Sequence, residues 1–464
     1  MSTAANKLLK EIEVFCSQAN MAKSTFGRLA INDGKLCSRL KDGKDVTLST
    51  STRIRDFINQ HQAAKTNNTL VNTVIENLSE KVNSERDEDL TKKVKIRFYD
   101  NRQNYLLFIN TTNEKWKVAE RAAKELTHLR PTPPALRIFD AGMGDATILT
   151  HLMRSLHRRY PIMPFFIVAK EISLEDVRIS LEKLSDRFME HPATVMIVTN
   201  MYYAEAPWLR PSSVNSAAAL NWHEVTLEGD CSHQYGEQLR GIDSMLVDGW
   251  QVKSSEVTGN PVYARPSVLV IYRKDHSFLL NNVIPKPGQV FGSYDFIIAS
   301  QPWRARTSAA FKAKKVLAPL VKALAPHGRL LAIQSSGADP ALELINEIWP
   351  DERPFGIDRH KLIKALKDEL GRESRNYNFL TGSDTKSLIR YNMHVMPDEI
   401  EHSIGTSTLF AAWNAAVYVN QIENQRIEPI IQTAGYLKVT AKILKKYNGL
   451  WFNDESFVVS KKGI

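Results

Sequence analysis

The residues best suited to chemistry lie where apolar, strand-like segments end. The first such segment, 136–139, runs into Asp140 and is followed by Gly142 and Gly144. Glycine lacks the Cβ that keeps a backbone away from a ligand, and it tolerates positive φ. A strand-to-helix turn of this kind can also present unpaired backbone N–H groups. Because ordinary turns share the pattern, it indicates a binding loop only together with other residues.

Three further strand-like segments end in polar residues. Glu171 follows the second segment, Asn200 follows the third, and the fourth ends in Ser300–Gln301–Pro302–Trp303. The carboxyl ends of parallel strands meet at one edge of a sheet, where such folds bind ligands. A carboxylate there can accept both hydroxyls of a ribose, and an amide can meet an adenine. Taken alone, Glu171 is equally an exposed acid at a strand end, but the ordered set predicts a cofactor site.

These strand ends need a scaffold that brings them together. From residue 136 onward, strand and helix patterns alternate, which is typical of a parallel sheet with crossover helices. Residues 204–290 break the alternation with Gly, Pro and Asn turns, so we expect an inserted segment with β-hairpins. Near the end, 449–462 predict two short strands joined around Asn453–Asp454. The expected sheet strands are 136–140, 165–170, 194–199, 294–299 and 328–334.

The first part of the chain has a different character. Residues 1–62 predict a small helical module, with apolar residues such as Leu8, Ile12 and Phe15 at helical spacing. Residues 63–94 are mostly polar and predict a linker helix, which leaves 95–464 for the α/β domain.

Composition narrows the class of protein. Hydrophobic residues make up 43% of the 464, enough for a sizeable core. The chain has no apolar run of membrane-spanning length and no signal-peptide pattern, so we expect a cytoplasmic protein without a membrane partner. Its three cysteines lack the spacing of a zinc site. A net charge of +10 favours polyanionic partners, but a solvated basic surface would have the same composition.

The region from about 95 to 460 resembles the class I S-adenosylmethionine-dependent methyltransferases. FDAGMGDAT (139–147) is similar to the family's first motif, AKE (169–171) to its second and YDFIIASQPW (294–303) to its fourth. LAPHGRLLAI (324–333) resembles the following helix-to-strand passage. The closing segment LWFNDESFVVSK (450–461) resembles the antiparallel last strands that distinguish this fold from a dehydrogenase.

The resemblance implies a Rossmann-like, seven-stranded sheet with helices on both faces, preceded by a small all-α domain. It also implies S-adenosyl-L-methionine as the cofactor, with Glu171 at the ribose and Asn200 at the adenine. The cofactor-binding residues so implied are Asp140, Ala141, Gly142, Gly144, Glu171, Ile172, Asn200 and Ser300.

The fourth-strand tetrad departs from the family's amino-methylating members, which carry an acid or Asn, two prolines and an aromatic residue. Here Gln301 replaces the first proline, so the acceptor atom stays open between N and O. An in-line methyl transfer depends mostly on positioning, so we expect neither a catalytic triad nor a metal. The catalytic candidates are Ser300, Gln301 and Trp303, and the substrate-binding candidates are Tyr105, Phe108, Trp116, Trp303 and Arg304.

Within the helical module of residues 1–62, the segment 24–58 resembles helix-turn-helix domains of the phage-repressor type. In that interpretation the second helix faces a DNA groove and offers Lys35, Ser38, Arg39 and Lys41 as contacts. A helical protein-interaction or dimerisation module has the same pattern, and the sequence favours neither.

Three functions are consistent with these patterns. The leading hypothesis is a methyltransferase acting on a small-molecule or macromolecular acceptor. The alternatives are a DNA-binding regulator whose large domain senses S-adenosylmethionine without turnover, and a nucleic-acid methyltransferase. The insertion at 204–290 could cover the acceptor or form a homodimer contact.

Overall fold

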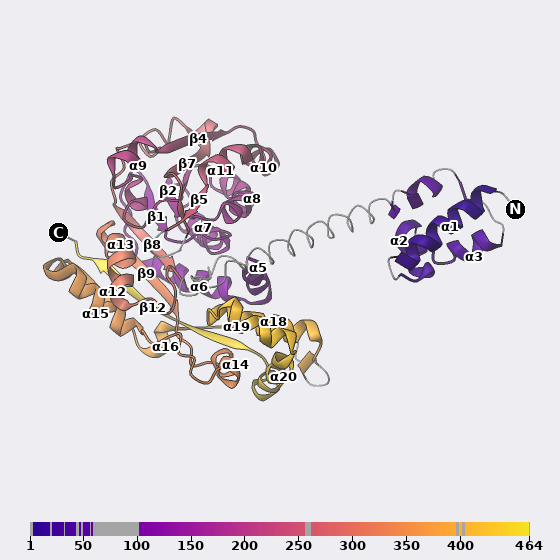
Figure 1. Ribbon diagram of the computed structural model, residues 1–464. Coiled ribbons are helices and arrows are strands. Elements are labelled where there is room, and N and C mark those ends of the chain that lie inside the picture. Colours follow the sequence, from indigo (N-terminus) through magenta and orange to yellow (C-terminus); the bar gives the residue numbers. More distant parts are fainter. Residues whose placement is uncertain are drawn as a thin grey trace, which may run out of the picture. The chain divides into compact units, whose positions relative to one another are not determined.

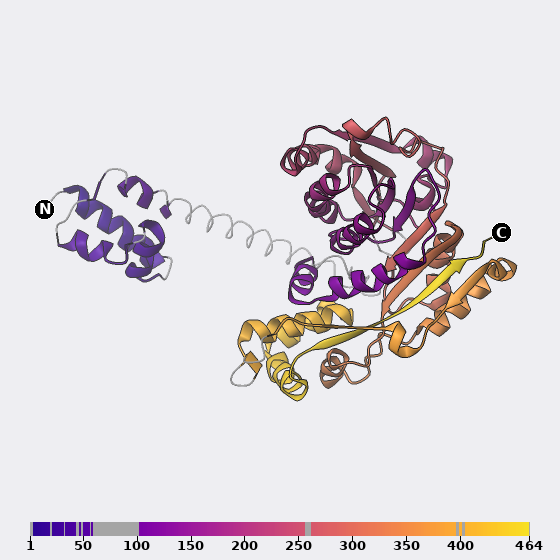
Figure 2. The same ribbon diagram turned by 180° about the vertical axis from the view of Figure 1, so that it is seen from behind.

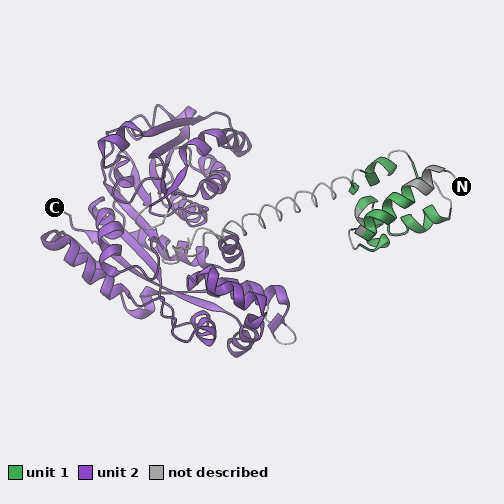
Figure 3. Cartoon of the chain, viewed as in Figure 1, with its two compact units in different colours: residues 1–94 green, residues 95–464 purple. Residues whose placement is uncertain are grey.

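The computed structural model describes residues 3–58 and 102–463, except 19–20, 32, 43–45, 48–49, 56, 256–260, 396–398 and 401–403. The chain forms two compact units, 1–94 and 95–464 (Figure 3). The predicted linker helix at 63–94 lies outside the described residues.

The N-terminal unit is helical, as predicted. It contains α1 (Thr3–Gln18), α2 (Lys23–Ile31), α3 (Leu36–Lys41) and a helical segment within 50–58. Apolar residues one helical turn apart bury a common core. At its centre Phe26 packs edge-on against Phe15 and Phe57, with ring centroids 5.5 Å away in both cases.

Gly27 allows the chain to fold back closely after α2. The Asp33 N–H donates to the Gly27 carbonyl at 2.9 Å. A Cβ at residue 27 would lie only 2.2 Å from the Asp33 carbonyl oxygen, a backbone atom that cannot rotate away. The turn between α2 and α3 therefore requires glycine at this position.

We predict that Gly27→Ala destabilises the N-terminal unit by about 1–3 kcal/mol, the usual effect of overpacking. Hydrogen exchange of the full chain should show lost protection in α1–α3. Gly34→Ala is the matched control, because its Cβ would meet the movable Arg28 side chain at 3.0 Å. Equal loss of protection in both variants would contradict the prediction.

The larger unit is built on one mostly parallel sheet with helices on both faces (Figures 1 and 2). The strand order is β10-β12-β9-β8-β1-β2-β3-β7-β4, with β11 also paired to β12. The five predicted strands are confirmed as β1 (Leu136–Asp140), β2 (Phe165–Lys170), β3 (Thr194–Thr199), β8 (Tyr294–Ser300) and β9 (Leu324–Ser335). The others are β4 (Asn221–Leu227), β7 (Ser267–Arg273), β10 (Tyr377–Leu380), β11 (Leu388–Asn392) and β12 (Trp451–Lys461).

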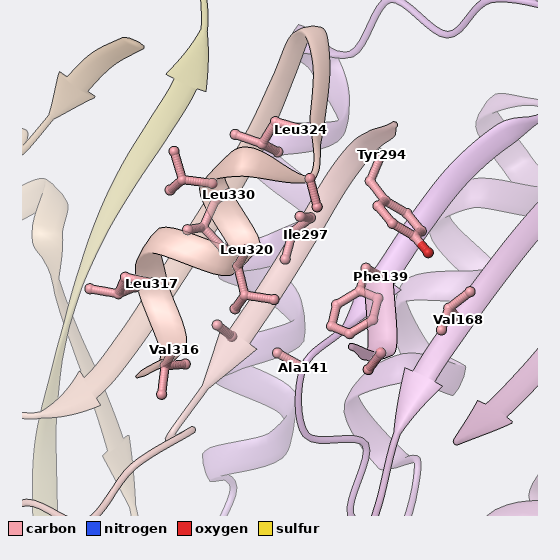
Figure 4. Close-up of a cluster of buried hydrophobic side chains, with 14 of the residues drawn as sticks. Phe139, Ala141, Val168, Tyr294, Ile297, Val316, Leu317, Leu320, Leu324 and Leu330 are labelled. Atoms are coloured by element: carbon pink, nitrogen blue, oxygen red, sulfur yellow. The ribbon is translucent and has the colours of Figure 1, made fainter. Parts of the chain in front are cut away.

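Side chains alternate between two cores, one on each face of the sheet. On one face α6 (Glu114–Glu125), α7 (Thr147–Arg159) and α8 (Leu174–Glu190) pack on the strands. On the other face a π-helical turn (Ala313–Leu317), α13 (Ala318–Lys322) and α15 (Arg359–Leu370) bury their apolar side chains. Figure 4 shows part of this second core, where Leu320 lies near Ile297 of β8 and Phe139 of β1 lies near Tyr294.

A third core lies at the β11–β12 end of the larger unit. It joins α5 (Arg102–Thr111), α14 (Pro340–Ile348) and α18 (Thr406–Val419) to α19 (Asn424–Gln432) and α20 (Gly435–Tyr447). The shorter helices are α9 (Val214–Ala218), α10 (Ser232–Gly241), α11 (Asp243–Gly249), α12 (Ala309–Lys312) and α16 (Asp384–Ser387). Among the described residues, no helix has both the length and the apolar character to cross a bilayer.

The α/β fold class is confirmed, but the sheet has ten strands where seven were predicted. Two additional strands, β4 and β7, come from the 204–290 insertion, and β11 is the third. Among the described residues of that insertion, only β5 (Val252–Ser254) and β6 (Pro261–Tyr263) pair as successive antiparallel strands, so the expectation of several hairpins was wrong. Every residue of β7 is buried, because β3 and β4 flank it and apolar cores cover both faces.

The predicted hairpin at 449–462 is also wrong. Asn453 and Asp454 lie inside the continuous strand β12, which runs antiparallel between β9 on one side and β10 and β11 on the other. These neighbours satisfy the backbone groups on both sides of residues 453–454, so the chain has no reason to turn there.

Candidate functional site

A cavity of about 410 Å³ lies at the carboxyl ends of β1, β2, β8 and β9. Its volume falls within the usual range of small-molecule sites. Helices α5 and α6, the end of α18 and strand β11 supply the remaining walls. The lining residues are Tyr105, Phe108, Glu114, Lys115, Ala141, Gly142, Gly144, Lys170, Glu171, Ile172, Ser173, Glu175, Asp176, Tyr203, Ser300, Gln301, Pro302, Trp303, Arg304, Ser335, Tyr391, Tyr418, Val419 and Gln421.

The glycine turn after β1 forms the floor of the cavity. Gly144 adopts φ +54°, and a Cβ there would lie 3.0 Å from the Tyr105 hydroxyl, so glycine suits the position on both counts. Asp140 lies beneath the turn and accepts the Gly142 N–H at 3.1 Å. Burial raises the pKa of Asp140 to about 7. This residue therefore supports the turn and does not line the cavity.

Glu171 fastens the turn to the next strand. Its Oε2 accepts the Gly144 N–H at 2.8 Å, and its Oε1 accepts the N–H groups of Ile172 at 2.8 Å and Ser173 at 2.9 Å. A carboxylate has about four acceptor positions. One position, on Oε2, is left for a ligand, whereas the sequence predicted that Glu171 would accept two ribose hydroxyls.

The residues 300–303 at the end of β8 border the cavity, but only some of their polar groups have hydrogen-bond partners among the described residues. Gln301 has φ +51°, and its amide is bound to Ser335, donating to Oγ at 3.0 Å and accepting the N–H at 3.2 Å. The Gln301 amide therefore connects the loop after β8 to β9. Ser300 Oγ is buried and has no hydrogen-bond partner among the described residues, so it is the tetrad's free polar group.

Trp303 is held by a buried polar chain. Its Nε1–H donates to Gln334 at 3.0 Å, and Gln334 donates in turn to Glu455 at 2.8 Å and to the Ile357 carbonyl at 2.7 Å. Glu455 forms an ion pair with the buried Arg359 at 3.2 Å. The indole ring is therefore fixed in orientation at the cavity wall.

The helical wall is aromatic with one buried ion pair. Phe108 stacks on Tyr418 at a centroid distance of 4.8 Å. Lys115 Nζ lies 3.4 Å from Glu114 and 5.6 Å from the centre of the Tyr105 ring. Burial opposes the charge on Lys115, but Glu114 together with Tyr105, Asp145 and Tyr418 outweighs that effect and raises the lysine pKa.

Most of the predicted site residues lie together at this cavity. Those that line it are Tyr105, Phe108, Ala141, Gly142, Gly144, Glu171, Ile172, Ser300, Gln301, Trp303 and Arg304.

Three predicted residues do not line the cavity and are corrected: Asp140, which lies beneath the glycine turn, Asn200 and Trp116. Asn200 is 2% exposed, and its amide donates to the carbonyls of Gly249 and Arg265 and accepts the Ser267 N–H. It fastens the insertion to the end of β3, so it is not available to an adenine. Trp116 is 60% exposed, and its ring contacts the tilted His151 ring at a centroid distance of 4.6 Å. It follows Lys115 on α6 and so lies on another side of that helix.

Several lining residues were not predicted from the sequence. Lys170 directly precedes Glu171, so its position at the same strand end could have identified it. Tyr203 follows β3 by four residues. No comparable signal marks Tyr391, Tyr418 or Gln421, because the tertiary packing of β11 and α18 brings them to the site.

The DNA-contact candidates lie on the exposed side of the N-terminal unit. Lys35, Ser38, Arg39 and Lys41 are all exposed, around the buried Leu36, Cys37 and Leu40 of α3. Arg39 forms an ion pair with Asp33 at 2.7 Å.

No family model and no curated protein matches the sequence. Solved structures with some likeness include a putative sarcosine dimethylglycine methyltransferase from Galdieria sulphuraria, at 12% identity and a TM-score of 0.28, covering 78% of this chain and 86% of that one. A geranyl diphosphate methyltransferase with sinefungin has 11% identity and a TM-score of 0.25, with 74% and 78% covered. The [4+2]-cyclase SpnF has 10% identity and a TM-score of 0.27, with 78% and 82% covered. These values are too low to support an inference about activity.

We predict that Gln334→Leu destabilises the protein by about 2–4 kcal/mol, because it leaves the Trp303 N–H and a Glu455 oxygen buried without partners. Urea denaturation monitored by circular dichroism measures the change. Gln238→Leu is the control, since that exposed glutamine bonds only backbone carbonyls and one N–H that water can reach. A loss of stability no greater than the control's would contradict the role given to Gln334.

Proposed function

We propose that the larger unit is an S-adenosylmethionine-dependent methyltransferase and that the cavity holds this cofactor. The observation that carries the proposal is the hydrogen bond from the Gly144 N–H to Glu171, which brings the glycine turn and the strand-end acid to one cavity. The antiparallel strand β12 beside β9 also supports it, since this feature separates the methyltransferase fold from the dehydrogenase fold.

The cavity residues fit such a cofactor. Gly142 has only the Ser300 carbonyl within 4.0 Å of where a Cβ would be, so a ligand can approach the turn closely. The free position on Glu171 Oε2 accepts one ribose hydroxyl. When bound, S-adenosylmethionine supplies a sulfonium methyl, whose carbon bonds to the acceptor's lone pair as its bond to sulfur breaks.

The chain's own contribution is to position the acceptor. The fixed Trp303 ring gives a face for a planar or cationic group. Ser300 Oγ can accept a hydrogen bond from the acceptor's N–H or O–H, because no described group uses it. Holding the acceptor in line is the main catalytic requirement of this reaction.

We predict that S-adenosylhomocysteine binds the wild-type chain in titration calorimetry and that Glu171→Gln weakens binding about 10- to 100-fold. The loss corresponds to one hydrogen bond to a charged group. Glu182→Gln, an exposed acid on α8, is the matched control and should leave the affinity unchanged. Failure of wild type to bind either S-adenosylmethionine or its demethylated product would refute the assignment.

We further propose that the N-terminal unit contacts DNA through α3. The exposure of Ser38 and Lys41 on α3 and of Lys35 at its N-cap supports it, as does the four-residue connection from α2 with a glycine. Arg39 contributes less, because Asp33 already neutralises it.

If this is correct, duplex affinity of the full chain falls steeply with salt, since neutralised phosphates release counterions. Lys41→Gln should reduce the slope of the logarithm of affinity against that of salt by about one. Salt-independent behaviour, or no binding at low salt, would favour a protein-interaction module. Fluorescence anisotropy with a labelled duplex measures both quantities.

A further inference from the structure

The charged groups that line the cavity are not all paired. Among its acids, Glu114 pairs with Lys115, Glu171 accepts three backbone N–H groups, Glu175 pairs with Arg178 at 2.9 Å, and Asp176 is not without a partner either. Two cations, Lys170 and Arg304, make no ion pair and no side-chain hydrogen bond with any described residue.

Lys170 lies at the last position of β2 and turns its ammonium group towards an aromatic ring. Its Nζ is 4.8 Å from the centre of the Tyr203 ring. Burial lowers the pKa of this lysine, with the Glu171 carboxylate nearby opposing the shift. Lys170 is partly buried, and an ammonium group that is partly removed from water is normally paired, so its position at a cavity wall points to a partner that arrives with a ligand.

Arg304 lies in the loop after β8, directly after Trp303. Its neighbour Arg306 behaves differently, because it forms an ion pair with Glu352 and donates to the Gln421 carbonyl at 2.9 Å. The planar fork of a guanidinium group matches a carboxylate or phosphate. Arg304 is partly buried on the cavity wall, and its guanidinium group makes no ion pair or hydrogen bond with the described residues.

Tyr203 joins the two loops. Its hydroxyl donates to the Pro302 carbonyl at 3.1 Å while its ring faces Lys170. The loop after β3 is thus hydrogen-bonded to the Pro302–Arg304 segment, and both cations line the same cavity as Trp303.

We propose that the methyl acceptor is a small organic anion, whose carboxylate or phosphate binds between Lys170 and Arg304 while its remaining part lies against Trp303. The inference rests on the proposed function and deepens it. A carboxylate or phosphate at this place pairs with the two cations that have no ion-pair partner among the described residues, whereas a cationic acceptor would be repelled by them.

The test uses the full chain saturated with S-adenosylhomocysteine and four probes of similar shape: benzoate, phenyl phosphate, benzyl alcohol and benzylamine. Calorimetry should show the anions binding at least about tenfold more tightly than the alcohol or the amine. The tighter of the two anions identifies the acceptor's charged group. Equal affinity for all four probes, or no anion binding, would overturn the inference while leaving S-adenosylhomocysteine binding intact.

The variants Lys170→Gln and Arg304→Gln should each weaken anion binding at least about tenfold. Lys315→Gln removes the same charge from an exposed position near α12 and should have no effect. An unchanged affinity for 5′-methylthioadenosine shows that each variant is folded.

Affinity for the cofactor product separates the remaining outcomes. If Lys170→Gln and Arg304→Gln weaken S-adenosylhomocysteine but not 5′-methylthioadenosine, the cations bind the amino-acid carboxylate of the cofactor and the inference is wrong. If S-adenosylhomocysteine does not bind the wild type at all, the proposed function fails, and the inference fails with it.

Discussion

The site depends on the three backbone N–H groups that converge on the Glu171 carboxylate. They come from two separate segments, the turn after β1 and the residues directly after β2. A carboxylate accepting several N–H groups is well stabilised as an anion, and it fixes both segments at once. The same carboxylate therefore fixes both the shape of the glycine turn and the position of the carboxyl end of β2. A substitution at Glu171 changes the floor of the cavity as well as its chemistry.

A second set of buried polar contacts fixes the opposite wall. Gln334 and Glu455 come from neighbouring strands, β9 and β12, and connect Trp303 to Arg359 of α15. Gln301 adds a direct link from the loop to Ser335 of β9. Gln334, Glu455 and Arg359 are buried and the other members of these contacts are partly buried, so losing any one leaves a partner without its hydrogen bond away from bulk water. This wall of the cavity is held in place because its hydrogen bonds run to strands of the sheet itself.

Strand ends were the most predictable part of the site, since apolar runs of five to seven residues are visible in the sequence and parallel topology places their ends together. Asn200 shows the limit of this reasoning. Its residue type suits a ligand contact, but backbone groups of the insertion some 50 to 70 residues later use its amide. Tyr418 and Gln421 show another limit, because they reach the cavity through tertiary packing of a helix with no distinctive pattern. Asn453–Asp454 resembled a turn locally, and sheet pairing on both sides overrode that preference.

The place of β12 in the sheet has a consequence for biosynthesis. This strand pairs with β9, β10 and β11, all of which precede it in the sequence. Until residues 451–461 have left the ribosome, those three strands keep backbone edges without their final partner. Unpaired edges attract other chains, so nascent protein at this stage is the form most exposed to aggregation and most dependent on chaperones.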